Sequence, residues 1–124
     1  MVVFCKQSVD LLTENKMDTL PKGNEIIICA TCNNHITEPS KQIIMNNSFY
    51  HAFANPGGIV FEIGCFSDAK GCIPGSMSSF EFSWFPGYSW EIGVCVNCST
   101  HLGWIFSSTD NHFFGLIFER LIFP

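Results

Sequence analysis

Apolar residues fall in short runs along the chain, and turn-forming residues separate these runs. The strand candidates that this pattern defines are residues 25–29, 42–45, 48–54, 58–66, 78–84, 89–96, 102–107 and 113–122. Strong turn formers stand between several of them, such as Asn46-Asn47 and the Asn-Pro-Gly-Gly segment at 55–58. Because the runs are strand-sized and show no long helical period, the pattern predicts an all-β fold of antiparallel strands.

The run at 78–84 alternates most regularly. Phe80, Phe82 and Trp84 are separated by polar residues, as in a strand that buries one face. We therefore expect a half-buried strand at this position. The stretch 113–123 at the end of the chain is apolar enough for a short buried helix, but its Phe and Ile content and its internal glycine favour a strand.

The first 23 residues are the most polar and charged part of the chain. Residues 8–17 could form one or two helical turns, but a loosely attached arm is favoured because chain termini are often poorly ordered. The remaining chain, 24–124, is long enough for one hydrophobic core and too short for two. We therefore expect an N-terminal arm over 1–23 and one domain over 24–124.

Composition and charge narrow the class of protein. Of the 124 residues, 47% are hydrophobic and 15% aromatic, which predicts a packed globular domain and not a disordered chain. Only six Lys and Arg are present and the formal net charge is −5, so we expect no nucleic-acid partner. No signal peptide and no run of membrane-spanning length is visible, so we expect no membrane association. We expect the protein to be a monomer.

Four of the seven cysteines form two Cys-x-x-Cys pairs, Cys29/Cys32 and Cys95/Cys98, each at the end of a predicted strand. Such a pair places two thiolates on one tight turn, and two pairs complete the tetrahedral ligand set of zinc. Two disulfides or a redox pair are the alternatives, but a thioredoxin-like motif would need a βαβ unit. We expect one structural zinc ion, since four thiolates leave no coordination position open for catalysis.

The other cysteines, Cys5, Cys65 and Cys72, are odd in number, which argues against a complete disulfide framework. A reducing compartment, the cytoplasm or nucleus, is therefore mildly favoured, and secretion stays open. Cys65 and Cys72 could still pair with each other and leave Cys5 free.

All three tryptophans lie in the second half of the chain. Trp84 and Trp90 flank the turn at 85–88, so a bend there could bring their rings face to face. Trp104 follows the second cysteine pair, with Phe106 two residues later on the same strand face. These rings could form a rigid box for a small ring-shaped ligand; the alternative is that they belong to the core, as tryptophans in β-domains usually do.

Several motifs carry a specific resemblance. They are SWFPGYSW at 83–90, Cys95 with Cys98, HLGWIF at 101–106 and FGL at 114–116. Together they closely resemble the thalidomide-binding (CULT) domain family of cereblon, and the first cysteine pair and Asn55-Pro56 fall in matching places. The resemblance covers roughly 25–124 and implies the β-tent fold, in which zinc holds two antiparallel sheets at an angle.

The resemblance also implies a ligand. Trp84, Trp90 and Trp104 would wall a pocket for glutarimide, with Phe106 at its base. The backbone carbonyl of Phe82 would accept the imide N–H, and the backbone N–H of Trp84 would donate to a ring carbonyl. The remaining implied ligand residues are Ser83, within the same segment, and Asn55, on a loop that approaches the outer part of the ligand.

The ligands that the resemblance implies are thalidomide-type compounds and C-terminal cyclic imides on damaged proteins. The cage residues alone would also suit a uracil-like ring or a methylammonium group. Vertebrate cereblon has a histidine where this chain has Phe82, so a side-chain hydrogen bond to the ligand is lost here. The Lon-like domain through which cereblon docks a ligase adaptor has no counterpart in this sequence, so we expect no adaptor docking by this domain, whether free-standing or excised.

Catalysis is not expected. The candidate bases are His35, His51, His101 and His112. We expect His101 to pack or cap beside the second cysteine pair and His51 to lie on a solvent-facing strand surface. No serine elbow, paired carboxylates or phosphate loop accompanies them. The alternatives to a ligand-binding module are a protein-interaction domain without a small-molecule ligand and, less favoured, a zinc hydrolase.

Overall fold

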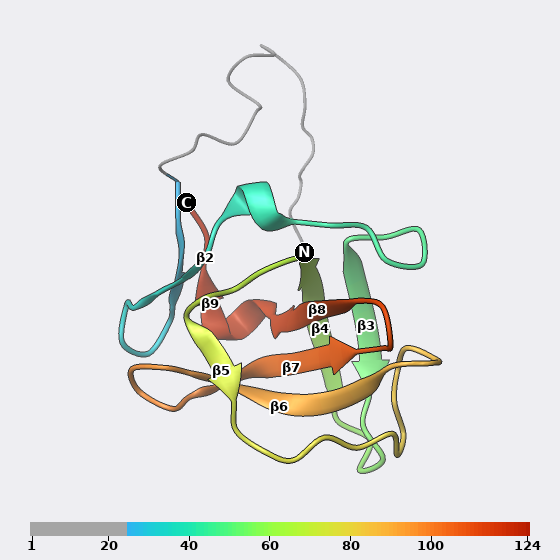
Figure 1. The fold of residues 1–124 in the computed structure, drawn as a ribbon. Coiled ribbons are helices and arrows are strands. Elements are labelled where there is room, and N and C mark those ends of the chain that lie inside the picture. Colours follow the sequence, from blue (N-terminus) through green and yellow to red (C-terminus); the bar gives the residue numbers. More distant parts are fainter. Residues whose placement is uncertain (1–24) are drawn as a thin grey trace.

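Two antiparallel sheets make up the computed structural model, which describes residues 25–124 (Figure 1). The predicted arm at 1–23 lies outside the described residues. The smaller sheet has the order β2-β1-β9 and consists of β1 (Ile27–Cys29), β2 (His35–Thr37) and β9 (Leu121–Ile122). The prediction of an all-β fold with two antiparallel sheets is confirmed.

The larger sheet has six strands in the order β3-β4-β8-β7-β6-β5. Its members are β3 (Tyr50–Ala54), β4 (Val60–Phe66), β5 (Cys72–Pro74), β6 (Ser89–Cys95), β7 (His101–Ser107) and β8 (His112–Ile117). Two 3₁₀ turns complete the described fold, η3 (Pro39–Lys41) and η4 (Phe118–Arg120). Because η4 lies between β8 and β9, the chain passes there from the large sheet to the small one (Figure 1).

The core has two parts that correspond to the two faces of the large sheet. Side chains on β7 alternate between them, since Ile105 belongs to one buried cluster and Trp104 and Phe106 belong to the other. The first cluster includes residues of the small sheet such as Ile27 and surrounds the cysteine pairs. The second is rich in aromatic rings and supports the tryptophans. The two cysteine pairs and the tryptophans therefore lie on opposite faces of the large sheet.

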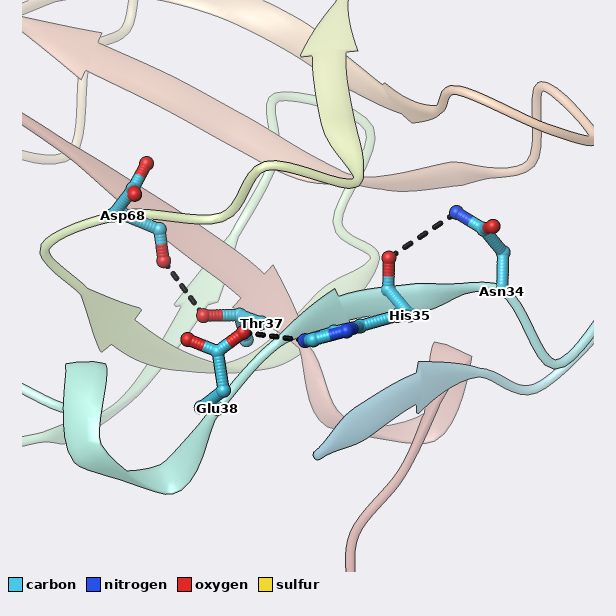
Figure 2. A network of polar contacts seen from close by, with 5 residues as sticks. All are labelled: Asn34, His35, Thr37, Glu38 and Asp68. Atoms are coloured by element: carbon cyan, nitrogen blue, oxygen red, sulfur yellow. Dashed lines mark hydrogen bonds and ion pairs between the residues drawn. The ribbon is translucent and has the colours of Figure 1, made fainter. Parts of the chain in front are cut away.

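The segment 67–71 ties the small sheet to the large one. The buried hydroxyl of Thr37 on β2 donates to the Asp68 carbonyl at 2.6 Å, beside the contact between His35 and Glu38 (Figure 2). The Gly71 N–H donates to the Ile36 carbonyl at 3.0 Å, and the Gly71 carbonyl accepts from the Val96 N–H at 2.9 Å. A Cβ at position 71 would lie 2.2 Å from the His35 carbonyl oxygen, so this close approach requires glycine.

The predicted strand at 78–84 is wrong. This segment is a loop whose only ladder contact is an isolated bridge between Ser79 and Trp90. Phe82 has a φ of +57°, in the left-handed region that no strand contains, and its side chain is 73% exposed. The alternation is present in the sequence, but the loop folds back on β6 because the Trp90 indole N–H donates to the Glu81 carbonyl at 2.7 Å.

Other boundaries also differ from the prediction. The run at 42–45 forms only isolated bridges, Gln42 with Phe66 and Met45 with Ser48, and is not a strand. The run at 113–122 is interrupted by η4 after Ile117. The short strands β2 and β5 were not predicted. Within the described part of the chain, no helix has the length and apolarity needed to cross a membrane.

Candidate functional site

The two cysteine pairs meet where the two sheets approach each other. Cys29 ends β1 in the small sheet and Cys95 ends β6 in the large sheet. All four Sγ atoms lie within 4.8 Å of one another, with Cys29 to Cys98 at 3.7 Å and Cys32 to Cys95 at 3.6 Å. A tetrahedron with zinc–sulfur bonds of about 2.3 Å has sulfur–sulfur edges of about 3.8 Å. The cluster is therefore consistent with zinc.

The two cysteine turns have the same backbone conformation. Asn33 and Ser99, each one residue past its pair, have φ values of +66°. Their N–H groups donate back to the carbonyls of Cys29 and Cys95 at 2.8 and 2.9 Å. Asn adopts the left-handed region more readily than most residues, which suits it to the first turn. The repeated geometry explains why both pairs present their sulfurs to one point.

The pKa values of Cys98, Cys65 and Cys72 are shifted in different directions. The Thr100 hydroxyl, 3.0 Å from the sulfur, is the first cause that lowers the pKa of Cys98 to about 6. Burial raises the pKa of Cys65 and of Cys72 to about 12, so both are neutral thiols. Cys65 and Cys72 are free cysteines in different core clusters, and no disulfide joins them.

A cavity of about 540 Å³ opens on the aromatic face of the large sheet, a volume usual for small-molecule sites. It is lined by Asn55, Pro56, Phe61, Glu81, Phe82, Trp84, Trp90, Ile92, His101, Trp104 and Phe106. Six of the seven ligand residues expected from the sequence thus lie at one cavity. The exception is Ser83, whose hydroxyl bonds the backbone of Phe85, donating to its carbonyl at 3.1 Å.

The walls of this cavity are fixed by ring packing and by indole hydrogen bonds. Trp84 meets Trp104 edge-on at 4.7 Å between ring centroids and stacks on Phe53 at 4.9 Å. Its indole N–H donates to the Ala54 carbonyl at 3.1 Å. Among the described residues Trp90 makes no ring contact with Trp84, so the expected face-to-face arrangement of these two rings is wrong. All three indoles line the cavity, with Trp84 and Trp104 in contact with each other.

The backbone at the cavity rim carries an unpaired donor and an unpaired acceptor. Phe82, with its left-handed φ, and Trp84 stand two residues apart. Within residues 25–124, neither the Phe82 carbonyl nor the Trp84 backbone N–H has a hydrogen-bond partner. A non-glycine residue in this conformation is uncommon and is found more often at functional sites than elsewhere. Both groups belong to residues that line the cavity and have no hydrogen-bond partner within the described chain.

Comparison with known proteins identifies the domain. No family model matches the chain. It is 31% identical to protein cereblon of Drosophila virilis over 123 residues, which are 93% of this chain and 19% of that protein. It is 30% identical to protein cereblon of Drosophila persimilis over 124 residues, or 96% of this chain and 20% of that protein. It is 36% identical to protein cereblon of Danio rerio over 91 residues, which are 67% of this chain and 21% of that protein.

This chain is a CULT-like domain, homologous to a small part of cereblon. It spans about a fifth of the length of the curated relatives it matches. The resemblance stated from the motifs is confirmed.

Five residues of the CULT-like domain that line the cavity were not predicted: Pro56, Phe61, Glu81, Ile92 and His101. Phe61 is the most informative, because its ring packs edge-on against Trp104 at 5.1 Å and forms a further aromatic wall. Apolar residues around Phe61 alternate with other residues along β4, and this pattern predicts a strand. The pattern does not reveal which residues the Phe61 side chain contacts. Pro56 could have been inferred from its position beside Asn55.

Two histidines of the CULT-like domain are placed by packing. The His101 Nε2–H donates to the Gly103 carbonyl at 2.9 Å, and the ring lies edge-on to Trp104 at 4.9 Å. Burial is the main cause that lowers the pKa of His101, so the ring is neutral. His101 has a packing role, but its ring packs against Trp104 at the cavity, whereas the sequence-based expectation placed it beside the second cysteine pair. The solvent-facing position expected for His51 is wrong, because its ring is half-buried against Phe53 and Phe85.

The side chains that line the cavity are mostly apolar or aromatic. No Ser, Thr, Cys, Tyr or Lys side chain is among the described lining residues, and Glu81 is their one carboxylate. The one imidazole, that of His101, has its Nε2–H already engaged by a backbone carbonyl. Apolar walls with a few placed polar groups are typical of small-molecule binding sites.

Proposed function

We propose that this CULT-like domain binds cyclic imides in its tryptophan-lined cavity. The observation that carries the proposal is the unpaired pair at the rim, the Phe82 carbonyl and the Trp84 backbone N–H. A cyclic imide presents an N–H between two carbonyls, so one edge of the ring can donate to the first group and accept from the second. A buried polar edge without such partners would cost about 1–3 kcal/mol per group.

The aromatic walls suit the other part of such a ligand. A six-membered imide such as glutarimide has a ring of methylene groups opposite its polar edge. Trp84, Trp104 and Phe61 are held by contacts with one another and with β3, so little ordering is needed when a ring enters. We expect the physiological partner to be a small cyclic imide, or a peptide that ends in one, and the thalidomide-type compounds to occupy the same place.

Zinc at the four-cysteine site is part of the same proposal. The sulfur–sulfur distances fit a tetrahedral zinc ion, and all four positions would be filled by thiolates. The ion would then hold the ends of β1 and β6 together and take no part in turnover. We propose accordingly that the domain binds its ligand without catalysis.

Methylation of the imide nitrogen gives the sharpest test of the proposed contact. Glutarimide should quench the tryptophan fluorescence of the zinc-loaded domain in a saturable way. N-methylglutarimide has the same ring but no N–H to donate to the Phe82 carbonyl, and its methyl group would face that oxygen. We expect its affinity to be lower by at least about fivefold, since a lost hydrogen bond that leaves a buried acceptor unpaired costs about 1–3 kcal/mol.

Equal binding of the two compounds would contradict the proposed polar contact while leaving the aromatic box in place. A flat titration with both, on protein shown to be folded and metal-loaded, would contradict the proposed function and favour a protein-interaction domain. Succinimide, with a smaller ring and the same polar edge, separates the contribution of the walls from that of the edge.

A further inference from the structure

We propose that Arg120 is a positioning residue that couples the four-cysteine site to the wall of the cavity. Arg120 ends η4, on the segment that joins the two sheets. Its backbone carbonyl accepts a hydrogen bond from the N–H of Ala30 at 3.0 Å, inside the first cysteine turn. Its guanidinium Nη1 donates to the carbonyl of His101 at 2.7 Å, just beyond the second cysteine pair. One residue thus contacts the chain at both cysteine pairs.

The connection continues from His101 into the cavity. His101 is the first residue of β7, and its ring lies edge-on to the Trp104 indole at 4.9 Å. Its Nε2–H donates to the carbonyl of Gly103, the residue that precedes Trp104. Both His101 and Trp104 line the cavity. His101 therefore connects the two sites: its carbonyl is bonded by Arg120, and its ring packs against Trp104.

The strand needs an external support at this position. The pairing of β6 with β7 shifts between Gly93, opposite Gly103, and Val94, opposite His101. A bulge of this kind disrupts the ladder locally and re-aims the neighbouring side chains. Arg120 bonds the chain on the outer side of that irregularity, where the strand begins. A guanidinium donates charge-assisted hydrogen bonds in a fixed planar geometry, which suits it to holding one carbonyl in place.

The consequence is a cavity wall that depends on a residue outside the cavity. Arg120 does not line the cavity. Without its hydrogen bond to the His101 carbonyl, the start of β7 loses one of the contacts that fix it, and the His101 ring beside Trp104 is held less firmly. Since binding sites lose much of their affinity when a supporting contact lets them shift by about 1 Å, we expect about tenfold weaker binding.

The affinity part of the test rests on the proposed imide binding. Arg120→Ala, Arg120→Lys and the matched control Glu119→Ala, an exposed neighbour in η4, are compared with the parent for zinc content and glutarimide affinity. We expect Arg120→Ala to keep one zinc ion per chain and bind about tenfold more weakly well below its melting temperature. Arg120→Lys should recover part of the affinity, and Glu119→Ala should behave as the parent.

A double-mutant cycle with His101→Ala separates positioning from general stability. If Arg120 acts through the His101 ring, its removal should cost little further affinity once that ring is absent. Full additivity of the two losses, or an Arg120→Ala affinity equal to that of Glu119→Ala, would overturn the proposal. Should Arg120→Ala fail to fold, Arg120→Met, which keeps an aliphatic stem and lacks the donor, takes its place in the cycle.

A readout without ligand keeps this proposal distinct from imide binding. The three indole N–H signals in a ¹H–¹⁵N NMR spectrum report on the tryptophans directly. Arg120→Ala should move the Trp104 signal most, whereas Glu119→Ala should leave all three in place. If the parent binds no glutarimide but the Trp104 signal moves as expected, the positioning role stands and the proposed function fails. An unmoved Trp104 signal overturns the positioning role whatever the imide does.

Discussion

Replacing Trp84 by alanine should weaken glutarimide binding by at least about thirtyfold, or about 2 kcal/mol, as expected for a tryptophan at the centre of a binding site. The ring stacks on Phe53 and meets Trp104 edge-on, so its loss removes one wall and releases a second. Trp84 is only half-buried, so the domain should stay folded. The measurement is a fluorescence titration that follows the remaining indoles, or calorimetry where their signal is too small.

Met77→Ala is the matched control for this prediction. Met77 is 89% exposed, precedes the same rim segment and does not line the cavity, so its replacement should leave the affinity unchanged. If Trp84→Ala bound glutarimide as tightly as Met77→Ala, Trp84 would be a structural residue alone. The interaction-domain hypothesis would then explain the aromatic cluster better.

Removing the metal should destabilise the domain by at least about 4 kcal/mol, equivalent to a fall in melting temperature of about 20 °C for a chain of this size. The physical reason is the size of the small sheet, whose strands β1, β2 and β9 have three, three and two residues. Such strands bury little apolar surface of their own. The four-cysteine site joins the end of β1 directly to the end of β6.

This second prediction is tested by metal analysis and thermal unfolding before and after chelation, and in Cys95→Ser. We expect one zinc ion per chain in the parent and less than one in the variant. Cys65→Ala is the control, because Cys65 is buried away from the cluster and should keep the full zinc content. An unchanged melting temperature in metal-free protein would mean that the hydrogen bonds of the 67–71 segment suffice to join the sheets.

Local motifs allowed part of this architecture to be predicted. Each Cys-x-x-Cys pair is a local turn, and its position after a strand follows from the apolar run before it. The central strands β7 and β8 are continuous apolar runs because both of their faces are covered. The strands β2 and β5, with three residues each, are too short for any periodicity to appear.

The loop at 78–84 shows what alternation cannot determine. A phenylalanine with positive φ cannot be anticipated from its residue type, since Gly, Asn and Asp are the usual occupants of that region. The hydrogen bond from the Trp90 indole to Glu81 joins residues nine positions apart. The conformation of this loop is therefore determined by a tertiary contact, which the alternation of polar and apolar residues does not reveal.

Phe61 is a lining residue that sequence analysis missed and that lies far from the tryptophans along the chain. Trp84, Trp90 and Trp104 belong to neighbouring segments, but Phe61 comes from β4 and reaches Trp104 across the intervening strand β8. At Gly115 on β8, a Cβ would lie 2.8 Å from the Phe106 ring and 2.9 Å from the Ile63 side chain. The absence of a side chain at Gly115 therefore leaves room for the Phe106 and Ile63 side chains.

The backbone N–H group of Trp84 distinguishes an imide-binding cavity from an aromatic cluster that belongs only to the core. Its signal in a ¹H–¹⁵N NMR spectrum of the zinc-loaded domain can be followed as glutarimide is added. We predict a saturable downfield shift of this signal, with the same midpoint as the shifts of the indole signals, because the imide carbonyl accepts its proton. An unmoved Trp84 N–H at glutarimide concentrations that saturate any other response would contradict imide recognition at this rim.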